Sequence, residues 1–259
     1  YDLKIKNSAE VISDLAVDVL GLCEVENKNV LNDLNNAFED REYKIIHYES
    51  PDERGIDNAL LYDPKKFELL SSKPIVNFLG GDDKTRDILY VKGKFNRSLI
   101  HIFVNHWPSN YGGKKKAIPK RNSTARLLMA EVEQIRRIEE EPNIILLGDF
   151  NEDPDEQNVE LLGNIGLTSL MADMVGKNGI STYVYKGTDY LYDQIIVSEE
   201  VLDKKGMTIA DSSLYILDLP KYRQQEGKYK NYPFRFWAGD RLLGGYSDHL
   251  AIKVDLILN

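Results

Sequence analysis

Two clusters of polar residues, each placed where an apolar run ends, have the types and spacing needed for chemistry on phosphate esters. The apolar run 143–147 stops at a Gly-Asp-Phe-Asn motif (residues 148–151), and a second cluster near the C-terminus reads Gly-Gly-Tyr-Ser-Asp-His (residues 244–249). Alternate side chains of a strand point the same way, so Asp149 and Asn151 should lie together at a strand tip. Asp248 adds a hard oxygen ligand beside His249, whose proton moves near neutral pH. These groups predict a site that holds a metal and a phosphate.

Two further strand ends carry candidate residues. The apolar run that begins at residue 18 leads to Glu24, which is flanked by apolar residues and is therefore a better metal ligand than a solvated strand end. Glu26 and Asn27, which follow it, are expected to cap the next helix instead. The run 100–104 closes with Asn105 and His106, and a histidine at such a strand end is a candidate donor to phosphate.

Asp193 lies between apolar residues of the predicted strand 191–197, and a half-buried carboxylate is costly unless it is paired. Pairing with His249 would give Asp193 a partner and would fix which imidazole nitrogen faces the phosphate. The same pair occurs in Ser-His-Asp hydrolases, but the sequence has no Gly-x-Ser-x-Gly motif, so serine hydrolysis ranks well behind. The 4 histidines lack the spacing of a zinc site, and the carboxylate-rich set suits Mg²⁺ or Mn²⁺.

The composition is that of a globular α/β protein. Hydrophobic side chains make up 42% of the 259 residues, no apolar stretch approaches the length of a membrane span, and no Pro/Gly/Ser-rich linker divides the chain. We therefore expect one domain over residues 1–259. The single cysteine, Cys23, lies in an apolar run and is expected to be a small buried hydrophobe, so no disulfide framework is possible.

The net charge of −9 has the wrong sign for a protein that binds nucleic acid through a broad basic face. Part of this negative charge would come from carboxylates that bind a divalent cation, and the bound metal would offset it, so the net charge does not exclude nucleic acid. A cluster of basic residues follows the segment that ends at His106. Its simplest interpretation is a solvated loop and helix start, and the second interpretation is that the cluster attracts phosphate. The cluster comprises Lys114, Lys115, Lys116, Lys120, Arg121 and Arg126.

Hydrophobic periodicity predicts helices that alternate with strands. Helical spacing marks residues 5–16, 30–38 and 124–140, and a short helix is expected after Pro154. Strands are expected at 18–25, 43–48, 58–62, 75–78, 86–95, 98–106, 143–147, 182–185, 191–197 and 249–256. Asn96 and Arg97 join two of these strands in an antiparallel hairpin. Several strands are apolar on both faces, which predicts an α/β fold of two mixed sheets between outer helices, a four-layer α/β/β/α sandwich.

Five short motifs in this order resemble those of the endonuclease/exonuclease/phosphatase superfamily, whose fold is shared by pancreatic-type deoxyribonuclease and the apurinic endonucleases. The motifs are Leu22-Cys23-Glu24-Val25, Asn105-His106-Trp107-Pro108, Gly148-Asp149-Phe150-Asn151, Tyr192-Asp193-Gln194-Ile195 and Ser247-Asp248-His249. The resemblance spans residues 11–255 and implies a deoxyribonuclease I-like fold. It also implies an opening strand with an Asn-x-Glu-Asn-like motif that reaches the metal. Nothing before Tyr1 supplies that motif, so we expect the N-terminal strand to be missing from this sequence.

The roles of the family's residues, carried onto the matching positions, imply a complete hydrolytic site. Glu24 and Asp248 would bind Mg²⁺ or Mn²⁺. Asp149 would orient or deprotonate the attacking water, and Asn151 would hold the phosphate or that water. His106 and His249 would donate hydrogen bonds to phosphoryl oxygens, with Asp193 supporting His249.

The function that these residues predict is divalent-metal-dependent hydrolysis of a phosphoester, with a phosphodiesterase or nuclease ranked first. Family members cut DNA, RNA, inositol phosphates and sphingomyelin, so the natural substrate stays open. Asn105, Arg121 and Arg126 are expected to bind the substrate, and the basic cluster with Trp107 and Tyr111 would suit a nucleic-acid strand, although these aromatics also suit the core.

Two alternatives remain at this stage. One is a phosphatase that acts on a small phosphomonoester such as an inositol phosphate, and the other is a catalytically silent binding module of the same fold. We expect a monomer. The start shows no signal peptide, so the compartment stays open between the cytoplasm and export after loss of an unseen N-terminus.

Overall fold

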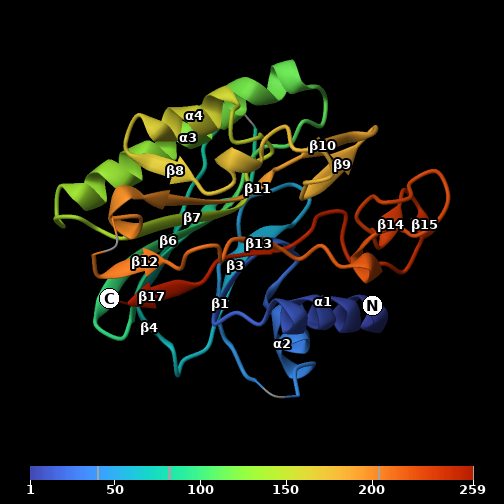
Figure 1. The fold of residues 1–259 in the computed structure, drawn as a ribbon, viewed down its shortest axis with the longest axis horizontal. Helices are drawn as coiled ribbons and strands as arrows, with labels where there is room; N and C mark the ends of the chain where they lie inside the picture. Colours follow the sequence, from blue (N-terminus) through green and yellow to red (C-terminus); the bar gives the residue numbers. More distant parts are fainter. Residues whose placement is uncertain (40, 81–82, 204, 259) are drawn as a thin grey trace.

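Helices and sheets form four layers in the computed structural model, which describes residues 1–39, 41–80, 83–203 and 205–258. In Figure 1, α3 (Lys114–Arg136) and α4 (Gln157–Gly163) cover one side of the strands. On the other side lie α1 (Asp2–Leu15) and α2 (Lys28–Asn36). The α/β class expected from the sequence is confirmed. None of the helices in the described ranges is long and apolar enough to cross a membrane.

The first inner layer is a mixed sheet of 6 strands in the order β4-β5-β6-β7-β11-β8. Only β6 and β7 run parallel, and α3 supplies the crossover that a parallel pair requires. The expected hairpin appears as the antiparallel pair of β5 and β6. The strands are β4 (Phe67–Ile75), β5 (Ile88–Phe95), β6 (Ser98–His106), β7 (Ile144–Asp149), β8 (Leu167–Ser169) and β11 (Asp193–Ser198).

The second inner layer consists of several antiparallel ladders in place of the single mixed sheet that we expected. Its main part has 3 strands in the order β1-β3-β2, namely β1 (Val19–Val25), β2 (Lys44–His47) and β3 (Asp57–Tyr62). Two separate pairs join β12 (Met207–Ile209) to β17 (Leu256–Leu258) and β13 (Tyr215–Ile216) to β16 (Ile252–Lys253). Two small hairpins, β9 (Tyr183–Tyr185) with β10 (Thr188–Tyr190) and β14 (Trp237–Ala238) with β15 (Arg241–Leu242), lie at one end of the molecule (Figure 1). Short 3₁₀ helices occur at Ala172–Met174, Glu199–Val201 and Pro220–Tyr222.

Alternation along the strands of the six-stranded sheet decides which side chains face each neighbouring layer. In β7, Ile144 and Leu146 belong to the core beneath α3, whereas Ile145 and the partly buried Leu147 belong to the core between the two sheet layers. This is the period of two that a strand imposes. A third core packs α1 and α2 against β1 and β3. Residues at odd positions of β7 therefore point inward, between the sheets.

Three segment boundaries differ from those predicted. The helix expected at 124–140 is α3, which begins at Lys114, because buried Ala117 and Arg121 hold its first turns in place despite the internal Pro119. The strand expected at 75–78 is β4 and ends at Ile75, since an edge strand with exposed polar residues shows little apolar alternation. The segment 249–256 forms only β16 and the start of β17.

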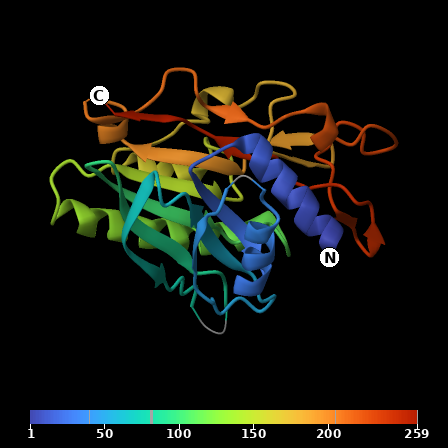
Figure 2. The ribbon, with the colours of Figure 1, turned by 90° about the horizontal axis from the view of Figure 1, so that it is seen from below.

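The C-terminal segment lies beside α1, far from it in sequence (Figure 2). The buried Asn7 donates its side-chain N–H groups to the carbonyls of Gly244 at 3.1 Å and Gly245 at 2.6 Å. Lys4 Nζ donates to the carbonyl of Tyr246 at 2.6 Å. These bonds hold the loop that leads into Asp248 and His249.

Candidate active site

Three adjacent strands place His106, Asp149 and Asp193 in one row across the sheet. Asp149 on β7 is the cross-strand partner of His106 on β6 and of Asp193 on β11. Cross-strand partners point to the same face, and here that face is the inner one because the three positions continue the inward-facing alternation of their strands. His106 Nε2 lies 3.5 Å from Asp149 Oδ2. The sequence predicted each strand end, and the register brings them together.

His249 completes the row from the C-terminal segment. Its Nδ1 lies 2.7 Å from Asp193 Oδ2, which is the pairing expected from the sequence. Tyr183 stacks on the imidazole with ring centroids 4.6 Å apart and an interplanar angle of 27°. The backbone N–H of Leu250 donates to the carbonyl of Thr182 at 2.8 Å, which ties the segment to the β9 hairpin. His249 is thus oriented by a carboxylate at one nitrogen and an aromatic ring on one face, and Nε2 is the nitrogen left for a ligand.

Asn151 holds the carboxylate of Asp149. Its backbone N–H donates to Asp149 Oδ1 at 2.8 Å, and its side-chain Nδ2 donates to Asp149 Oδ2 at 3.0 Å and to the carbonyl of Trp107 at 3.1 Å. These bonds occupy the amide hydrogens that we expected to hold phosphate. Asn151 has φ of 51°, an uncommon value for a residue other than glycine that occurs at functional sites. In this structure Asn151 therefore holds both carboxylate oxygens of Asp149.

Gly148 allows β6 and β7 to approach closely beside the site. Its φ is +125°, and a Cβ atom there would lie 2.0 Å from the carbonyl oxygen of Asn105. Neither condition suits a residue with a side chain. The glycine of the Gly-Asp-Phe-Asn motif therefore sets the distance between His106 and Asp149.

Burial and neighbouring charges separate the protonation behaviour of the three central groups. Burial raises the pKa of the Asp149 carboxyl from 3.8 to about 7, against the opposing positive charge of His249. Burial alone would lower the pKa of His249, but the carboxylates of Asp193, Asp149 and Asp248 outweigh it and raise the pKa to about 10. Burial, with the positive charge of Arg86, holds the pKa of His106 well below its usual value. At neutral pH, His249 is a cation and His106 is neutral.

The two predicted metal ligands lie on a bulged strand and on the loop that carries His249. Between Leu22 and Val25 the register of β1 against β3 shifts, and Glu24 adopts φ of 60°. Such a bulge turns a side chain out of the normal alternation. Glu24 Oε1 lies 3.7 Å from Arg54, and Asp248 Oδ2 lies 3.7 Å from Arg235, so both of these ionic contacts are long. Their side chains are 59% and 47% exposed.

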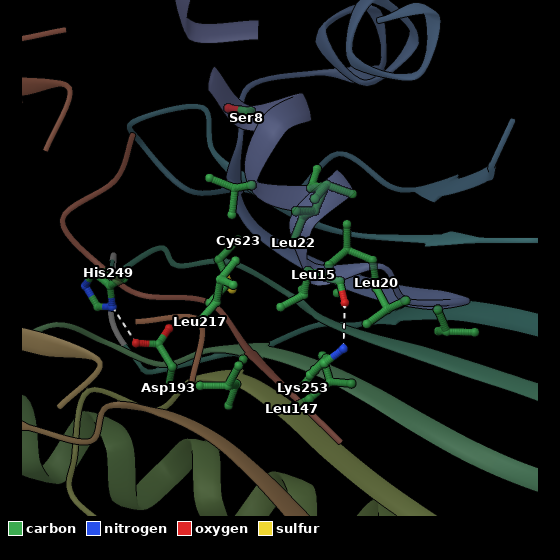
Figure 3. Close-up of a pocket in the computed structure, with 18 of the residues that line it drawn as sticks. Ser8, Leu15, Leu20, Leu22, Cys23, Leu147, Asp193, Leu217, His249 and Lys253 are labelled. Atoms are coloured by element: carbon green, nitrogen blue, oxygen red, sulfur yellow. Dashed lines mark hydrogen bonds and ion pairs between the residues drawn. The ribbon is translucent and has the colours of Figure 1, made fainter. Parts of the chain in front are cut away.

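Both carboxylates line a large groove. It runs between α1, β1 and β16 from the row formed by His106, Asp149 and Asp193, which we call the catalytic row. Its volume is about 1310 Å³. Figure 3 shows the His249–Asp193 pair at one side of it, Leu15 and Lys253 at the other, and apolar residues such as Leu22 and Leu147 between them. Among the described strands, β1 pairs only with β3 and β16 only with β13, so each has an edge without a partner strand. The opening strand that the resemblance implies stays a prediction.

A family model described as the Endonuclease/Exonuclease/phosphatase family matches residues 1–257. The chain belongs to this family. Enzymes of this superfamily are phosphoester hydrolases that typically depend on a divalent metal. A search of curated protein sequences found no match.

Solved structures of the Endonuclease/Exonuclease/phosphatase fold resemble the chain over nearly all of its length. Truncated TDP2 from Caenorhabditis elegans is 17% identical with a TM-score of 0.65, covering 99% of this chain and 90% of that chain. TDP2 from D. rerio, complexed with single strand DNA product, is 14% identical with a TM-score of 0.67, covering 99% and 92%. The human Nocturnin catalytic domain with bound sulfate anion is 17% identical with a TM-score of 0.65, covering 100% and 87%. At these identities the likeness concerns the fold.

Two of the three expected substrate-binding residues do not face the family's site. Asn105 is fully buried on the face of β6 opposite His106, where its side chain bonds the carbonyl of Phe103 and the indole N–H of Trp107. Arg121 is also fully buried, and its Nε lies 2.8 Å from Glu152 Oε1. Both expectations were therefore wrong, because neighbouring strand positions point to opposite faces and because α3 begins early enough to bury Arg121. Arg126 is exposed on α3 and bonds Asn122, so its contact with substrate stays a prediction.

Sequence reasoning missed three arginines that bring positive charge to the site. Arg86 is 5% exposed, pairs with Asp52 at 3.1 Å and donates to the carbonyl of Trp107 at 2.8 Å. Arg54 and Arg235 contact the two predicted metal ligands. All three arginines precede or follow strands in stretches without a motif, so the register of the folded sheets was needed to find them.

A separate cluster of potential metal ligands lies outside the family's site. His47, Glu49 and Asp57 hold ligand atoms within 4.8 Å of one another. Asp57 Oδ2 already bonds His47 Nε2 at 2.8 Å, and Asp57 Oδ1 accepts from the backbone and hydroxyl of Ser50. These bonds account for the cluster as a structural network at the start of β3.

Proposed function

We propose that this protein hydrolyses phosphodiesters with the help of a divalent cation and that it acts as a nuclease. The row of His106, Asp149 and Asp193, with His249 at 2.7 Å from Asp193, carries the proposal. It joins one carboxyl group with a pKa of about 7 to one imidazole with a pKa of about 10 in a single cleft. A pair of titratable groups whose pKa values are pushed apart is the usual basis of acid–base assignment.

Asp149 accepts the proton of the attacking water in this scheme. Its carboxyl titrates near 7, so a large fraction is ionised at neutral pH while it stays basic enough to accept a proton. Asn151 holds both of its oxygens and thereby fixes the direction from which water is activated. A base held in this way avoids the loss of orientation that would otherwise slow an in-line attack at phosphorus.

His249 stabilises the negative charge that grows on the phosphoryl oxygens. With Nδ1 bonded to Asp193, the protonated ring presents Nε2–H to the substrate. His106 contributes a neutral imidazole whose buried Nδ1 has no hydrogen-bond partner among the described residues. Donors already oriented in a water-poor site stabilise a transition state without reorganisation.

Glu24 and Asp248 are suited to hold the cation. They offer hard carboxylate oxygens that only long contacts to arginine engage, and no cluster of three acidic or histidine ligands forms around them among the described residues. One or two carboxylates, with water and substrate phosphate completing the set, is how proteins usually bind Mg²⁺. The bound metal would polarise the phosphoryl oxygen and stabilise the leaving oxyanion.

The proposal is tested by hydrolysis of bis(p-nitrophenyl) phosphate and of p-nitrophenyl phosphate, each with Mg²⁺, Mn²⁺ or chelator. We expect turnover of the diester that chelator abolishes and that His249→Ala and Asp193→Asn reduce by roughly 10²- to 10⁴-fold. Asp189→Asn is the matched control, since this exposed carboxylate lies on the neighbouring hairpin and faces away from His249.

Three results would contradict the proposal. Diester turnover in His249→Ala within tenfold of wild type would remove the catalytic assignment. Preference for the monoester would indicate a phosphatase, and no turnover of either ester by the folded wild type would favour a silent binding module.

A further inference from the structure

Four tyrosines form an aromatic surface directly beside His249, and the proposed hydrolysis gives them no role. They are Tyr183 and Tyr185 on β9, Tyr190 on β10 and Tyr192 just before β11. We call them the tyrosine face. Aromatic rings that continue from a catalytic imidazole indicate where the rest of a substrate lies once its phosphate is bound.

Strand register places all four rings on one side of the β9 hairpin. Tyr183 pairs with Tyr190 across the hairpin and forms an isolated bridge with His249 on its other side. Tyr185 lies two positions after Tyr183, and Tyr192 lies two positions after Tyr190, so their side chains point to the same side as those of Tyr183 and Tyr190. Val184, between the first two tyrosines, points to the other side and is only 6% exposed. The hairpin therefore directs its apolar residue inward and its tyrosines toward the site.

The rings form a connected series that starts at the imidazole. Tyr183 lies 4.6 Å from His249 and 5.5 Å from Tyr192, in both cases nearly parallel. Tyr190 lies 4.7 Å from Tyr192, and Tyr185 lies 6.5 Å from Tyr183 with only 9° between the planes. Nearly parallel rings at these separations form a platform on which a further flat ring can stack.

The four rings differ in exposure. Tyr192 is 7% exposed and serves as the base of the series, whereas Tyr185 at the outer end is 51% exposed. Lys186 Nζ lies 5.2 Å from the centre of the Tyr185 ring, which adds a positive charge at this end. A role in packing alone would not explain a half-exposed ring at the end of an aligned series.

Positive charge also borders the other side of the tyrosine face. Asn110 Nδ2 donates to the hydroxyl of Tyr192 at 3.2 Å, and the adjacent Tyr111 is 96% exposed. Lys115 and Lys116 follow within the first turn of α3 and are exposed. Of the nearby carboxylates, Glu156 pairs with Lys114 and Asp153 accepts the backbone N–H of Leu191 at 2.5 Å.

We propose that the tyrosine face binds the bases of a single-stranded nucleic acid whose scissile phosphate lies at His249. This inference rests on the proposed function and specifies its substrate class. Stacking on aromatic side chains beside a local group of cations is how proteins bind single strands without sequence preference. A duplex keeps its bases inside the stack, and the net charge of −9 opposes broad contact with duplex phosphates. A single strand supplies the flat rings that this surface accepts.

Binding is measured without hydrolysis, by fluorescence anisotropy of labelled ten-nucleotide oligo-dT and oligo-U in chelator. A decamer that contains 2-aminopurine reports stacking directly through quenching. The variants are Tyr185→Ala, Tyr185→Phe, which keeps the ring, and Tyr215→Ala. Tyr215 is the matched control, since it is 41% exposed on β13 beside Lys253, and Lys253 bonds the carbonyl of Leu15 at the far side of the groove.

We expect Tyr185→Ala to weaken binding by about 5- to 100-fold, as loss of one stacked base requires, and to reduce 2-aminopurine quenching. Tyr185→Phe and Tyr215→Ala should stay within twofold of wild type. Similar affinity for dT and U, which differ in the sugar and in the thymine methyl group, indicates that the strand is bound by stacking. Absence of oligonucleotide binding by the wild type, or equal effects of Tyr185→Ala and Tyr215→Ala, would overturn the inference. Because bis(p-nitrophenyl) phosphate turnover tests the catalytic proposal separately, either idea can fail alone.

Discussion

Replacing Asp149 by asparagine should make the protein more stable at neutral pH while it removes activity. The wild-type carboxyl titrates at about 7 in the folded chain because burial disfavours its charge, and at 3.8 when exposed. Its side chain is only 11% exposed, so solvent screens little of this effect. The folded state therefore binds the proton more tightly than the unfolded state, and wild-type stability falls as the pH rises from about 4 through about 7.

The size of the effect follows from the two pKa values. Each unit of pKa difference corresponds to about 1.4 kcal/mol, so ionised Asp149 destabilises the folded state by about 4 kcal/mol at pH 8. In Asp149→Asn, the new side-chain carbonyl can still accept the backbone N–H of Asn151. The new NH₂ group replaces the oxygen that accepts from Asn151 Nδ2, so that hydrogen bond is lost. Loss of that bond costs about 1 kcal/mol. The net gain for Asp149→Asn is about 3 kcal/mol at pH 8, and the variant becomes less stable by about 1 kcal/mol below pH 4.

Urea unfolding at a series of pH values from 3.5 to 8.5, in chelator so that no cation binds the site, measures this difference. The quantity to plot is the free energy of unfolding of Asp149→Asn minus that of the wild type, because titrating groups that do not interact with Asp149 cancel. His249 does not cancel, since the Asp149 carboxylate helps to raise its pKa. Asp240→Asn, which changes an exposed carboxylate, should give a flat line within about 0.5 kcal/mol of zero. A flat line for Asp149→Asn as well would refute the buried, proton-binding state of Asp149 and with it the proposed base.

Three further predictions concern the residues around this centre. Arg121→Met should lower the free energy of unfolding by about 3–5 kcal/mol, because it leaves the buried Glu152 without its ionic partner. In urea unfolding, the double variant that also carries Glu152→Gln should recover part of this lost free energy. Gly148→Ala should lower both the melting temperature and diester turnover, since its Cβ would lie 2.0 Å from the carbonyl oxygen of Asn105. The control Gly112→Ala, at a site with φ of +82° and nothing within 4 Å, should lower the melting temperature much less. Equal losses in the two variants would contradict the close approach of β6 and β7. Glu24→Gln should raise the Mg²⁺ concentration needed for half-maximal turnover at least about tenfold, and an unchanged metal titration would remove Glu24 from the ligand set.

The strand ends that carry His106, Asp149 and Asp193 could be predicted from the sequence, because an apolar run next to a polar residue marks each of them. Apolar runs that stop at His106 and Asp149, and one that starts after Asp193, identify buried strands and their polar tips, and the period of two assigns each tip to a face. The pair of Asp193 and His249 also followed from local chemistry, since a carboxylate among apolar residues requires a partner. These predictions needed no knowledge of how the strands are ordered.

The errors come from interactions that depend on the folded register. Asn105 precedes His106 by one position and so points to the opposite side of the sheet, which a motif read as a block does not distinguish. Arg121 belongs by sequence to an exposed basic cluster, but its helical phase directs it to Glu152 in the interior. Ladders of two residues, such as β13 with β16, are too short to leave a pattern in the sequence.

The site takes its parts from both inner layers, and this division separates two requirements of the proposed chemistry. The catalytic row belongs to three hydrogen-bonded strands of one sheet, where register fixes the spacing of His106, Asp149 and Asp193. The carboxylates suited to the cation lie on a bulge of β1 and on the loop held by Asn7 of α1. A bulge and a loop adjust more easily than a central strand, so the metal ligands can follow the substrate while the base stays in place. The tyrosine face meets the site at two places, because Tyr183 forms a bridge with His249 and Tyr192 directly precedes Asp193. A strand bound there would therefore contact both elements that hold the His249–Asp193 pair.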